Sequence, residues 1–572
     1  MKIKSLILAM FACSAFVACT NDVVIDEGGQ PNANADTYVS VRIALPEASG
    51  VGTRADGAAG YESGSVDEYY VEKAYIGIFD KDYNCIGYGV YKTSELGFTT
   101  PGAATDNITT TSNKVTVKSG KNPVYAMAVL NADTNPFSVT DGTAAFNNNA
   151  VSATIADVAT KNKFYMSSSN YAEKTGDTWN KTDGYTKINA ENYTTSETAN
   201  ATPITIHVER AVAKVNVSVS GTLDVRGAGY AVPGSSTDVV KLLGWGLNIT
   251  NKSYFPVKKI QATWDAHNSD DPENVWKSGA WTSAANFRSF WAIDPNYDEA
   301  SFGSTSPFNT ITPAGATTAL GKDEYCLENT FIHNYQNTNQ TTTAIIKAKY
   351  LYEGAEISDD TYLYKIGPEF YKGDVALKTQ IVKDLVAMGY YKQDKGAITA
   401  ADITFTYTNR GYTRIVVEGG VYEADGEAVK EVANFNTKTL YSSGIAAYKN
   451  GNCVYPVLIR QFNNTEVPLL SSVNTAAQLG RYGVVRNHVY KLTISAISGI
   501  GIPGGDDVII TPPLKPTDPT GPVDPENPGS EIDPVDPIDP TQPATPDDNL
   551  NVYIQCKIAI LAWAKRVQEV IL

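Results

Sequence analysis

Hydrophobic and polar residues alternate in short runs along most of this chain. The clearest early run is residues 38–46, YVSVRIALP, in which every second residue is aliphatic. These aliphatic positions are Val39, Val41, Ile43 and Leu45. Successive side chains of a strand point to opposite faces, so this pattern predicts a β-strand with one buried face.

A second run with the same alternation of aliphatic residues lies near the C-terminus, in residues 551–561. Its alternating positions are Val552, Ile554, Cys556, Ile558 and Ile560. We therefore predict a terminal strand there. Residues 562–572 leave an alternative open, because Trp563, Val567 and Val570 fall at helical spacings among helix-favouring Ala, Lys, Glu and Gln.

Further alternating runs occur at residues 343–350, 454–460 and 482–494, separated by turn residues, whereas sustained helical periodicity is scarce. The sequence thus predicts an all-β protein. Residues 204–219 read as one long strand whose apolar parity switches near residues 209–211, as a β-bulge would produce. The glycine-rich stretch 221–234 that follows is an expected domain boundary.

Length and composition predict a globular protein of two or more domains. The chain has 572 residues, of which 42% are hydrophobic and 10% aromatic, enough to bury a large core. Its formal net charge of -16 excludes a nucleic-acid partner, because no basic surface is available to neutralise phosphates.

The first residues read as an export signal. Lys2 and Lys4 precede an apolar run that ends at residue 18 and is too short to span a bilayer comfortably. The stretch FVAC resembles a bacterial lipobox, although Phe16 departs from its usual Leu, so Cys19 is the expected lipidated N-terminus and membrane anchor. The remaining cysteines, Cys85, Cys326, Cys453 and Cys556, lie far apart and form no zinc or disulfide pattern.

Residues 47–60 contain mostly small residues and one basic residue, Arg54. An Arg-specific protease would find Arg54 easily in such a segment. If cleavage released residues 38–46, a sheet would lose a member, and a strand from another molecule could fill the vacancy. The C-terminal ladder is the candidate for that strand. An ordinary loop arginine is the alternative.

A proline-rich tract separates the body of the chain from the terminal ladder. Proline recurs at every third residue over much of residues 513–546, which matches the turn of polyproline II. At about 3.1 Å per residue this tract would extend roughly 100 Å, which favours donation of the terminal strand to a neighbouring molecule over insertion into its own domain. A disordered linker is the alternative.

Catalytic motifs are absent from the sequence, and we predict no enzyme, no metal and no cofactor. The histidines, His207, His267, His333 and His488, are far apart, and there is no HExxH or GxSxG motif. The GxGxxG of residues 499–504 precedes the proline-rich tract instead of a helix. Residues 80–84 predict a hairpin turn, because Cys85 replaces the glycine of a calcium loop. Asp270, Asp271 and Glu273, with Trp276 nearby, are interpreted as a solvated acidic loop, and a carbohydrate site is the alternative.

Four segments together carry a family resemblance: VERAVAK at residues 208–214, ENT at residues 328–330, RNHVY at residues 486–490, and the proline-rich spacer before a strand containing Trp563. The chain resembles the fimbrillins, the type V pilins of minor-fimbrium kind from Gram-negative anaerobes. Cys556 has no matching family position. The resemblance implies two transthyretin-like β-sandwich domains, an outer-membrane lipoprotein precursor, trimming between Arg54 and Ala55, and polymerisation by donor-strand exchange.

These observations divide the chain into a signal peptide (1–18), a lipidated propeptide with a removable strand (19–54), two β-sandwiches (55–225 and 226–505), a linker (506–550) and a donor strand (551–572). We expect a stalk subunit of a cell-surface fimbrium that supports adhesion and biofilm formation. Its partners would be identical subunits, tip and anchor proteins, an Arg-specific protease and host or bacterial receptors. The alternatives are a tip adhesin and a surface carbohydrate-binding lipoprotein that never polymerises.

Overall fold

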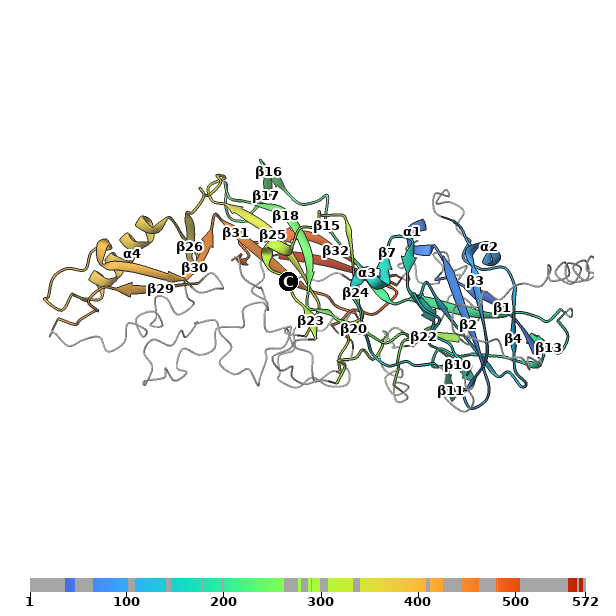
Figure 1. Ribbon diagram of the computed structural model, residues 1–572. Helices are drawn as coiled ribbons and strands as arrows, with labels where there is room; N and C mark the ends of the chain where they lie inside the picture. The colour runs from blue at the N-terminus through green and yellow to red at the C-terminus, as the bar shows by residue number, and fades with distance from the viewer. Residues whose placement is uncertain are drawn as a thin grey trace, which may run out of the picture.

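The computed structural model describes residues 37–46, 65–100, 109–139, 146–175, 178–197, 200–261, 276–278, 286–289, 291–298, 307–332, 340–407, 412–424, 445–461, 480, 482–504, 554–562 and 565–568. The protein is mostly β, which confirms the predicted fold class. Its sheets follow one another along an elongated molecule, with the N-terminal sheet at one end and a small α/β unit at the other (Figure 1).

The N-terminal sheet has the order β13-β1-β14-β9-β5-β2-β3, with β12 also on β5 and β4 also on β1. Its strands are β1 (Thr37–Ala44), β2 (Lys73–Phe79), β3 (Cys85–Lys92), β4 (Val115–Ser119), β5 (Tyr125–Leu130), β9 (Met166–Ser168), β12 (Thr186–Lys187), β13 (Tyr193–Thr194) and β14 (Ile204–Arg210). One hydrophobic core, which includes Val41, Ile76 and Val129, lies against these strands.

Two further sheets enclose a second core. The first has the order β24-β15-β32-β34-β35: β15 (Val212–Val219), β24 (Asp323–Leu327), β32 (His488–Ile497), β34 (Ile554–Ala562) and β35 (Lys565–Gln568). The second has the order β16-β17-β18-β25-β31-β33: β16 (Val225–Arg226), β17 (Gly229–Ala231), β18 (Val239–Asn248), β25 (Thr343–Leu351), β31 (Asn452–Leu458) and β33 (Ile502–Pro503). Trp245 and Tyr455 from one sheet pack with Val217 and Leu492 from the other.

A third, smaller unit was not expected from the sequence. Its sheet, β27-β26-β30-β29-β28, comprises β26 (Tyr362–Ile366), β27 (Glu369–Lys372), β28 (Ile403–Tyr407), β29 (Tyr412–Val417) and β30 (Ile445–Lys449). The helix α4 (Asp374–Ala387) buries Leu377, Ile381 and Leu385 in the core of this unit. These leucine and isoleucine residues recur every fourth position, which places them on one face of a helix.

Short elements complete the described chain. The helices are α1 (Val66–Tyr69), α2 (Thr93–Leu96) and α3 (Ile155–Val158). The short strands are β6 (Val151–Ser152), β7 (Ala159–Thr160), β8 (Lys163–Phe164), β10 (Tyr171–Thr175), β11 (Thr178–Lys181), β19 (Thr250–Asn251), β20 (Ser253–Tyr254), β21 (Trp276–Ser278), β22 (Asn286–Ser289) and β23 (Phe308–Asn309). Pairing of β6 with β20 and of β10 with β22 joins segments far apart in sequence.

The chain leaves the N-terminal sheet at Ala211, which corrects one expectation. Residues 204–219 are not one bulged strand, because β14 belongs to the N-terminal sheet and β15 to the next. The domain boundary expected after residue 225 stays a prediction. The parity switch was real, but a bulge and a passage between two sheets leave the same local pattern in a sequence.

The C-terminal residues form a strand hairpin. β34 confirms the predicted terminal strand, and β35 pairs antiparallel with it. The helical alternative for residues 562–572 is therefore wrong at residues 565–568. The predicted turn at residues 80–84 is also confirmed, since it connects β2 to β3.

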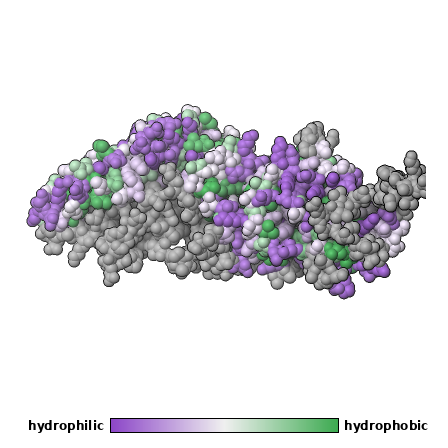
Figure 2. All heavy atoms as spheres, viewed as in Figure 1, coloured by the Kyte–Doolittle hydropathy of each residue, from purple (hydrophilic) through white to green (hydrophobic). Residues whose placement is uncertain are grey.

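Among the residues coloured by hydropathy in Figure 2, hydrophilic ones are the more frequent, and hydrophobic ones occur in small groups. Within the part of the chain that the structure describes, no helix has the length and apolarity needed to cross a membrane. Among the same residues, no group of three or more His, Cys, Asp or Glu side chains is placed to hold a metal ion.

Candidate functional site

The first strand occupies an internal position of the N-terminal sheet. β1 pairs antiparallel with β4 on one edge and, on the other, antiparallel with β13 and parallel with β14. Val41 illustrates this, since it stands between Val115 of β4 and Ile204 of β14. We call this position, bounded by β4 on one side and by β13 and β14 on the other, the first-strand slot.

The aliphatic ladder of the first strand is buried in the core. Relative exposure is 0% for Val39, Val41 and Ile43 and 2% for Leu45, as the alternation predicted. Burial of four such side chains contributes on the order of 10 kcal/mol before ordering costs. The opposite face is more covered than expected, because Ser40 is also buried, while Arg42 is exposed.

Backbone hydrogen bonds extend the slot beyond β1 itself. The Leu45 N–H donates to the Thr110 carbonyl (2.7 Å), and the Ser112 N–H donates to the Ile43 carbonyl (2.8 Å). At the other end the Thr37 hydroxyl donates to the Gly120 carbonyl (2.7 Å). Both edges of the first strand are therefore satisfied, and its removal would leave unpaired backbone groups on both walls.

The chain continues from the first strand to the next described element through the segment from Pro46 to Ser65. Arg54 and Ala55 belong to this segment but lie outside the described residues, as does Cys19. A cut anywhere in residues 47–64 would leave β1 held by hydrogen bonds and packing alone.

The predicted donor strand lies against its own chain in this structure. β34 pairs antiparallel with β32, with Leu492 opposite Ile558 and Tyr490 opposite Ile560. Ile554, Cys556, Ile558 and Ile560 lie on β34, and Val552 lies outside the described residues. The expectation that the spacer carries this strand away from its own domain is thus not met in the single chain. β34 therefore occupies the edge of β32 that faces away from β15.

Three of the four segments that carried the family resemblance meet at the passage between the two sheets, whereas the proline-rich spacer and Trp563 lie outside the described residues. The Arg486 side chain donates from Nε to Glu328 Oε2 (3.2 Å), and the Arg486 backbone N–H donates to Glu328 Oε1 (3.1 Å). Both side chains are about 1% exposed. The next residue, Asn487, donates its N–H to the Val212 carbonyl (2.7 Å) and accepts the Arg210 N–H on its side chain (3.3 Å). The motifs thus build a buried polar junction.

Two more buried ion pairs strengthen this junction. Lys258 Nζ lies 2.8 Å from Glu209 Oε2, and Lys214 Nζ lies 3.0 Å from Glu68 Oε1. The Tyr325 hydroxyl also donates to Glu68 Oε1 (2.7 Å). Burial acts to raise the pKa of Glu68, but the charges of Lys214 and Arg210 and this hydrogen bond hold that pKa below its ordinary value. The sequence could not reveal these pairs, because their members are far apart along the chain.

The histidines inside strands have structural surroundings. His488 lies in β32, is 1% exposed and places Nδ1 2.8 Å from the Arg486 carbonyl oxygen. His207 lies in β14 opposite Ala44 of the first strand. Burial lowers the pKa of His207 to about 3. His267 and His333 lie outside the described residues, as do Asp270, Asp271 and Glu273, whereas Trp276 begins β21.

A pH-dependent stability follows from His207. The unfolded chain takes up a proton near pH 6.5, whereas the folded chain does so only near pH 3, so stability falls as the pH drops through this window. We expect a loss of about 2 kcal/mol between pH 7 and pH 4.5 from this group. Urea unfolding at both pH values measures it. A His207→Asn variant should show a correspondingly smaller pH dependence, and an unchanged dependence would contradict the assignment.

Three cysteines are buried thiols without disulfides: Cys85, Cys326 and Cys453. Burial raises the pKa of the Cys85 thiol to about 11 and that of Cys453 to about 12. A thiol that stays protonated is a poor nucleophile. The GxGxxG at residues 499–504 runs into the strand β33, so it lacks the helix that a phosphate-binding loop needs.

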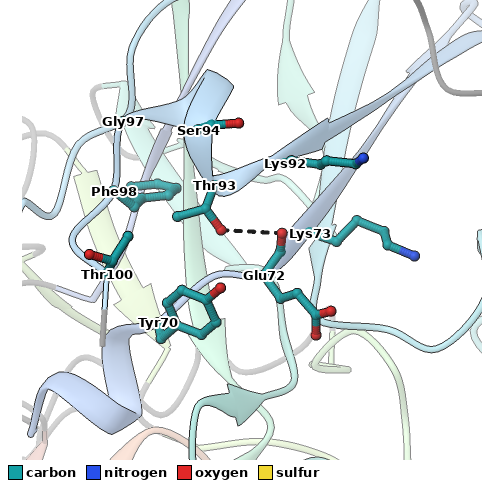
Figure 3. Close-up of a pocket in the computed structure, with 9 residues that line it drawn as sticks. All are labelled: Tyr70, Glu72, Lys73, Lys92, Thr93, Ser94, Gly97, Phe98 and Thr100. Carbon is teal, nitrogen blue, oxygen red and sulfur yellow. Dashed lines mark hydrogen bonds between the residues drawn. The ribbon is translucent and has the colours of Figure 1, made fainter. Parts of the chain in front are cut away.

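One open pocket of about 500 Å³ lies beside α2 (Figure 3). Its lining includes the rings of Tyr70 and Phe98 and the cross-strand neighbours Lys73 and Lys92. Glu72 is its one carboxylate, and no histidine or cysteine lines it. The pocket therefore offers no pair of groups for general acid–base or nucleophilic catalysis.

Comparison with known families decides the identity of the C-terminal region. Residues 446–569, from β30 to just beyond β35, match the sequence model of the family "Major fimbrial subunit protein type IV, Fimbrillin, C-terminal". This region is similar to the C-terminal part of the fimbrillins. The fimbrillin match includes the Arg486–Tyr490 motif, the β32 strand and the hairpin of β34 and β35. It confirms the resemblance drawn from the sequence.

Three solved structures show more distant likenesses, each at 12% identity. A candidate cell adhesion protein from Bacteroides eggerthii gives a TM-score of 0.34 and covers 94% of this chain and 97% of its own. A fimbrilin from Porphyromonas gingivalis gives 0.33, with 81% and 91% covered. The tip fimbrial protein Mfa3 from the same organism gives 0.30, with 80% and 95% covered. No curated protein sequence matches the chain. The fimbrillin assignment therefore rests on the family match.

Proposed function

We propose that this chain is a stalk subunit of a cell-surface fimbrium that supports adhesion and biofilm formation. In this proposal Cys19 carries the lipid of an outer-membrane precursor, cleavage between Arg54 and Ala55 releases the first strand, and the C-terminal strand of a second copy enters the first-strand slot. Tip and anchor proteins, an Arg-specific protease and surface receptors are the further partners. The fimbrillin match of residues 446–569 supports the class of protein.

The observation that carries the proposal is the position of β1. It is an internal strand with a buried aliphatic face, and the chain runs from it to the next described element through the segment that contains Arg54. Removal would uncover an apolar groove with unpaired backbone on both walls, which is the acceptor that β-strand addition requires. The terminal strand β34 (Ile554–Ala562) has a similar length and a similar aliphatic alternation.

The pairing of β34 with its own β32 favours a second candidate, a surface carbohydrate-binding lipoprotein that does not polymerise. In that case the terminal strand would stay where the single chain holds it. In the first candidate, β34 rests on β32 only until a vacant slot of another copy competes for it. The two candidates differ in whether trimmed chains associate.

The test is limited proteolysis of the purified precursor with an Arg-specific protease, followed by electrophoresis without heating. We expect a new N-terminus at Ala55 and an SDS-resistant ladder, because a joint that buries a full strand dissociates slowly. The matched control is Arg54→Ala, which should stay monomeric after the same treatment. A chain that is cut at Arg54, remains folded and stays monomeric would overturn the proposal in favour of the second candidate.

A further inference from the structure

The turn between β2 and β3 displays a tyrosine in an unusual backbone conformation. Tyr83 has a φ of +62°, in the left-handed region that glycine and asparagine normally occupy, and its side chain is 45% exposed. For a bulky residue this conformation costs roughly 1–2 kcal/mol. Strain of this kind, held in place by the surrounding structure, is common at functional sites.

Hydrogen bonds that the Asp80 side chain accepts hold the turn in this conformation. Asp80 Oδ1 accepts the Asp82 N–H (2.8 Å) and the Asn84 N–H (2.9 Å), and the Asn84 amide donates to Asp80 Oδ2 (3.2 Å). The backbone closes the turn as well, because the Tyr83 N–H donates to the Asp80 carbonyl (3.2 Å). The turn is thus rigid, and Tyr83 is presented in a fixed orientation.

Other aromatic rings support Tyr83 from beneath. Its ring stacks on Tyr125 with centroids 4.9 Å apart and an interplanar angle of 9°, and Tyr185 lies 4.8 Å away. The ring centroids of Tyr125 and Tyr185 are 5.9 Å apart, so the three tyrosine rings form one compact cluster. Tyr185 in turn packs edge-on against the buried Phe79 (5.2 Å), which anchors the stack to the core.

Charged groups surround the ring. Lys81 and Asp82 are exposed beside Tyr83 in the turn, and Asp183 is close enough to raise the pKa of Tyr83, after the larger effects of Tyr125 and of burial. Among the described parts of residues 65–139, Tyr83 is the one exposed large hydrophobic side chain. A single ring with a polar rim is too small for a protein interface, which needs a wider apolar patch.

We propose that Tyr83 is the stacking platform of a binding site for a neutral sugar ring of a glycan. One face of a pyranose carries C–H groups that pack on an aromatic ring, and its hydroxyls both donate and accept hydrogen bonds. Asp82 and Lys81 supply acceptors and donors at the rim. Asp80, Asp82 and Asp183 outnumber Lys81 and Lys187, the cross-strand neighbour of Tyr125, so the net local charge disfavours an acidic sugar.

This site is independent of the proposed polymerisation, because Tyr83 belongs neither to β1 nor to its strand partners. It can therefore be tested on the uncut, monomeric precursor. The probes are lactose, cellobiose and N,N′-diacetylchitobiose as neutral sugars and digalacturonic acid as the acidic one, with titration calorimetry as the measurement. We expect binding of at least one neutral probe and weaker binding of digalacturonic acid.

Variants at Tyr83 separate stacking from folding. Tyr83→Asn should weaken neutral-sugar binding about tenfold, because the ring is lost, while thermal stability is kept, since asparagine tolerates the left-handed conformation. Tyr83→Phe should retain most of the binding. The matched control is Tyr391→Asn, which removes a tyrosine that is 37% exposed elsewhere and should bind normally.

Three results would overturn the proposal. They are no binding of any neutral probe, equal binding by Tyr83→Asn and the unchanged chain, and preferential binding of digalacturonic acid. If no probe binds and Tyr83→Asn instead weakens ladder formation by trimmed chains, the exposed ring is a contact between copies of the chain.

Discussion

Removal of residues 551–572 is expected to abolish the SDS-resistant ladder of trimmed chains and to leave both main cores folded. β34 and β35 lie at the edge of their sheet, beyond β32, so the order β24-β15-β32 survives their loss. Without this hairpin the chain has no strand to place in the first-strand slot of another copy. Electrophoresis without heating measures the ladder, and circular dichroism checks the fold.

The matched control removes residues 565–572 only. It deletes β35 but keeps β34, so it should still form a ladder if β34 is the inserted strand. A trimmed chain without residues 551–572 retains an open slot, so when mixed with complete chains it should end growing polymers and shorten the ladder. A ladder formed by the fully truncated chain alone would show that another segment is the donor.

Substitution Glu328→Ala is expected to destabilise the fold by about 3–5 kcal/mol. Glu328 and Arg486 are about 1% exposed, and Arg486 makes two hydrogen bonds to this carboxylate. Loss of the carboxylate leaves the guanidinium buried with the Phe255 carbonyl (2.9 Å) as its remaining acceptor among these contacts. Urea unfolding measures the change in the free energy of unfolding.

Two comparisons interpret that result. The double variant Glu328→Leu with Arg486→Met removes both charges and should recover most of the stability, because the large cost comes from leaving one charge unpaired. Glu356→Ala breaks solvent-exposed ion pairs with Lys241 and Lys349 and should cost less than about 1 kcal/mol. A loss as small in Glu328→Ala as in Glu356→Ala would show that Arg486 remains solvated after the substitution.

Local alternation predicted the strands that matter most for the proposed function. The ladder of Val39, Val41, Ile43 and Leu45 is buried as expected, because burial of every second residue follows from strand geometry alone. Sheet membership is a long-range property, however. The pattern therefore revealed the parity switch at residues 209–211 without revealing that the chain passes there from one sheet to the next.

The sequence of α4 has the spacing of an amphipathic helix, but this single stretch was missed in a chain whose other patterns predict β-strands. Leu377, Ile381 and Leu385 recur every fourth residue in a stretch without proline or glycine, which is the period of a helix face. Together with β26 to β30 they form a unit whose core is separate from the two main cores. A search for helical spacing in each window would have found it.

The buried junction could not be predicted from spacing. Its motifs are conspicuous in the sequence, but Arg210 and Asn487 are 277 residues apart, and Glu328 and Arg486 are 158 apart. The amino acids themselves indicated neither their partners nor their burial. The parallel pairing of β32 with β15, in which Val489 lies opposite Lys214, brings Asn487 beside Val212.

The direct continuation of β14 into β15 has a mechanical consequence for a fibre built through the first-strand slot. β15 runs parallel to β32 over six residue pairs from Lys214 to Val219. Tension along such a fibre would load this pair of strands lengthwise. In this shear geometry the evenly spaced bonds of a parallel pair must yield together instead of unzipping one by one, so the subunit would resist stretching along the axis in which it is pulled.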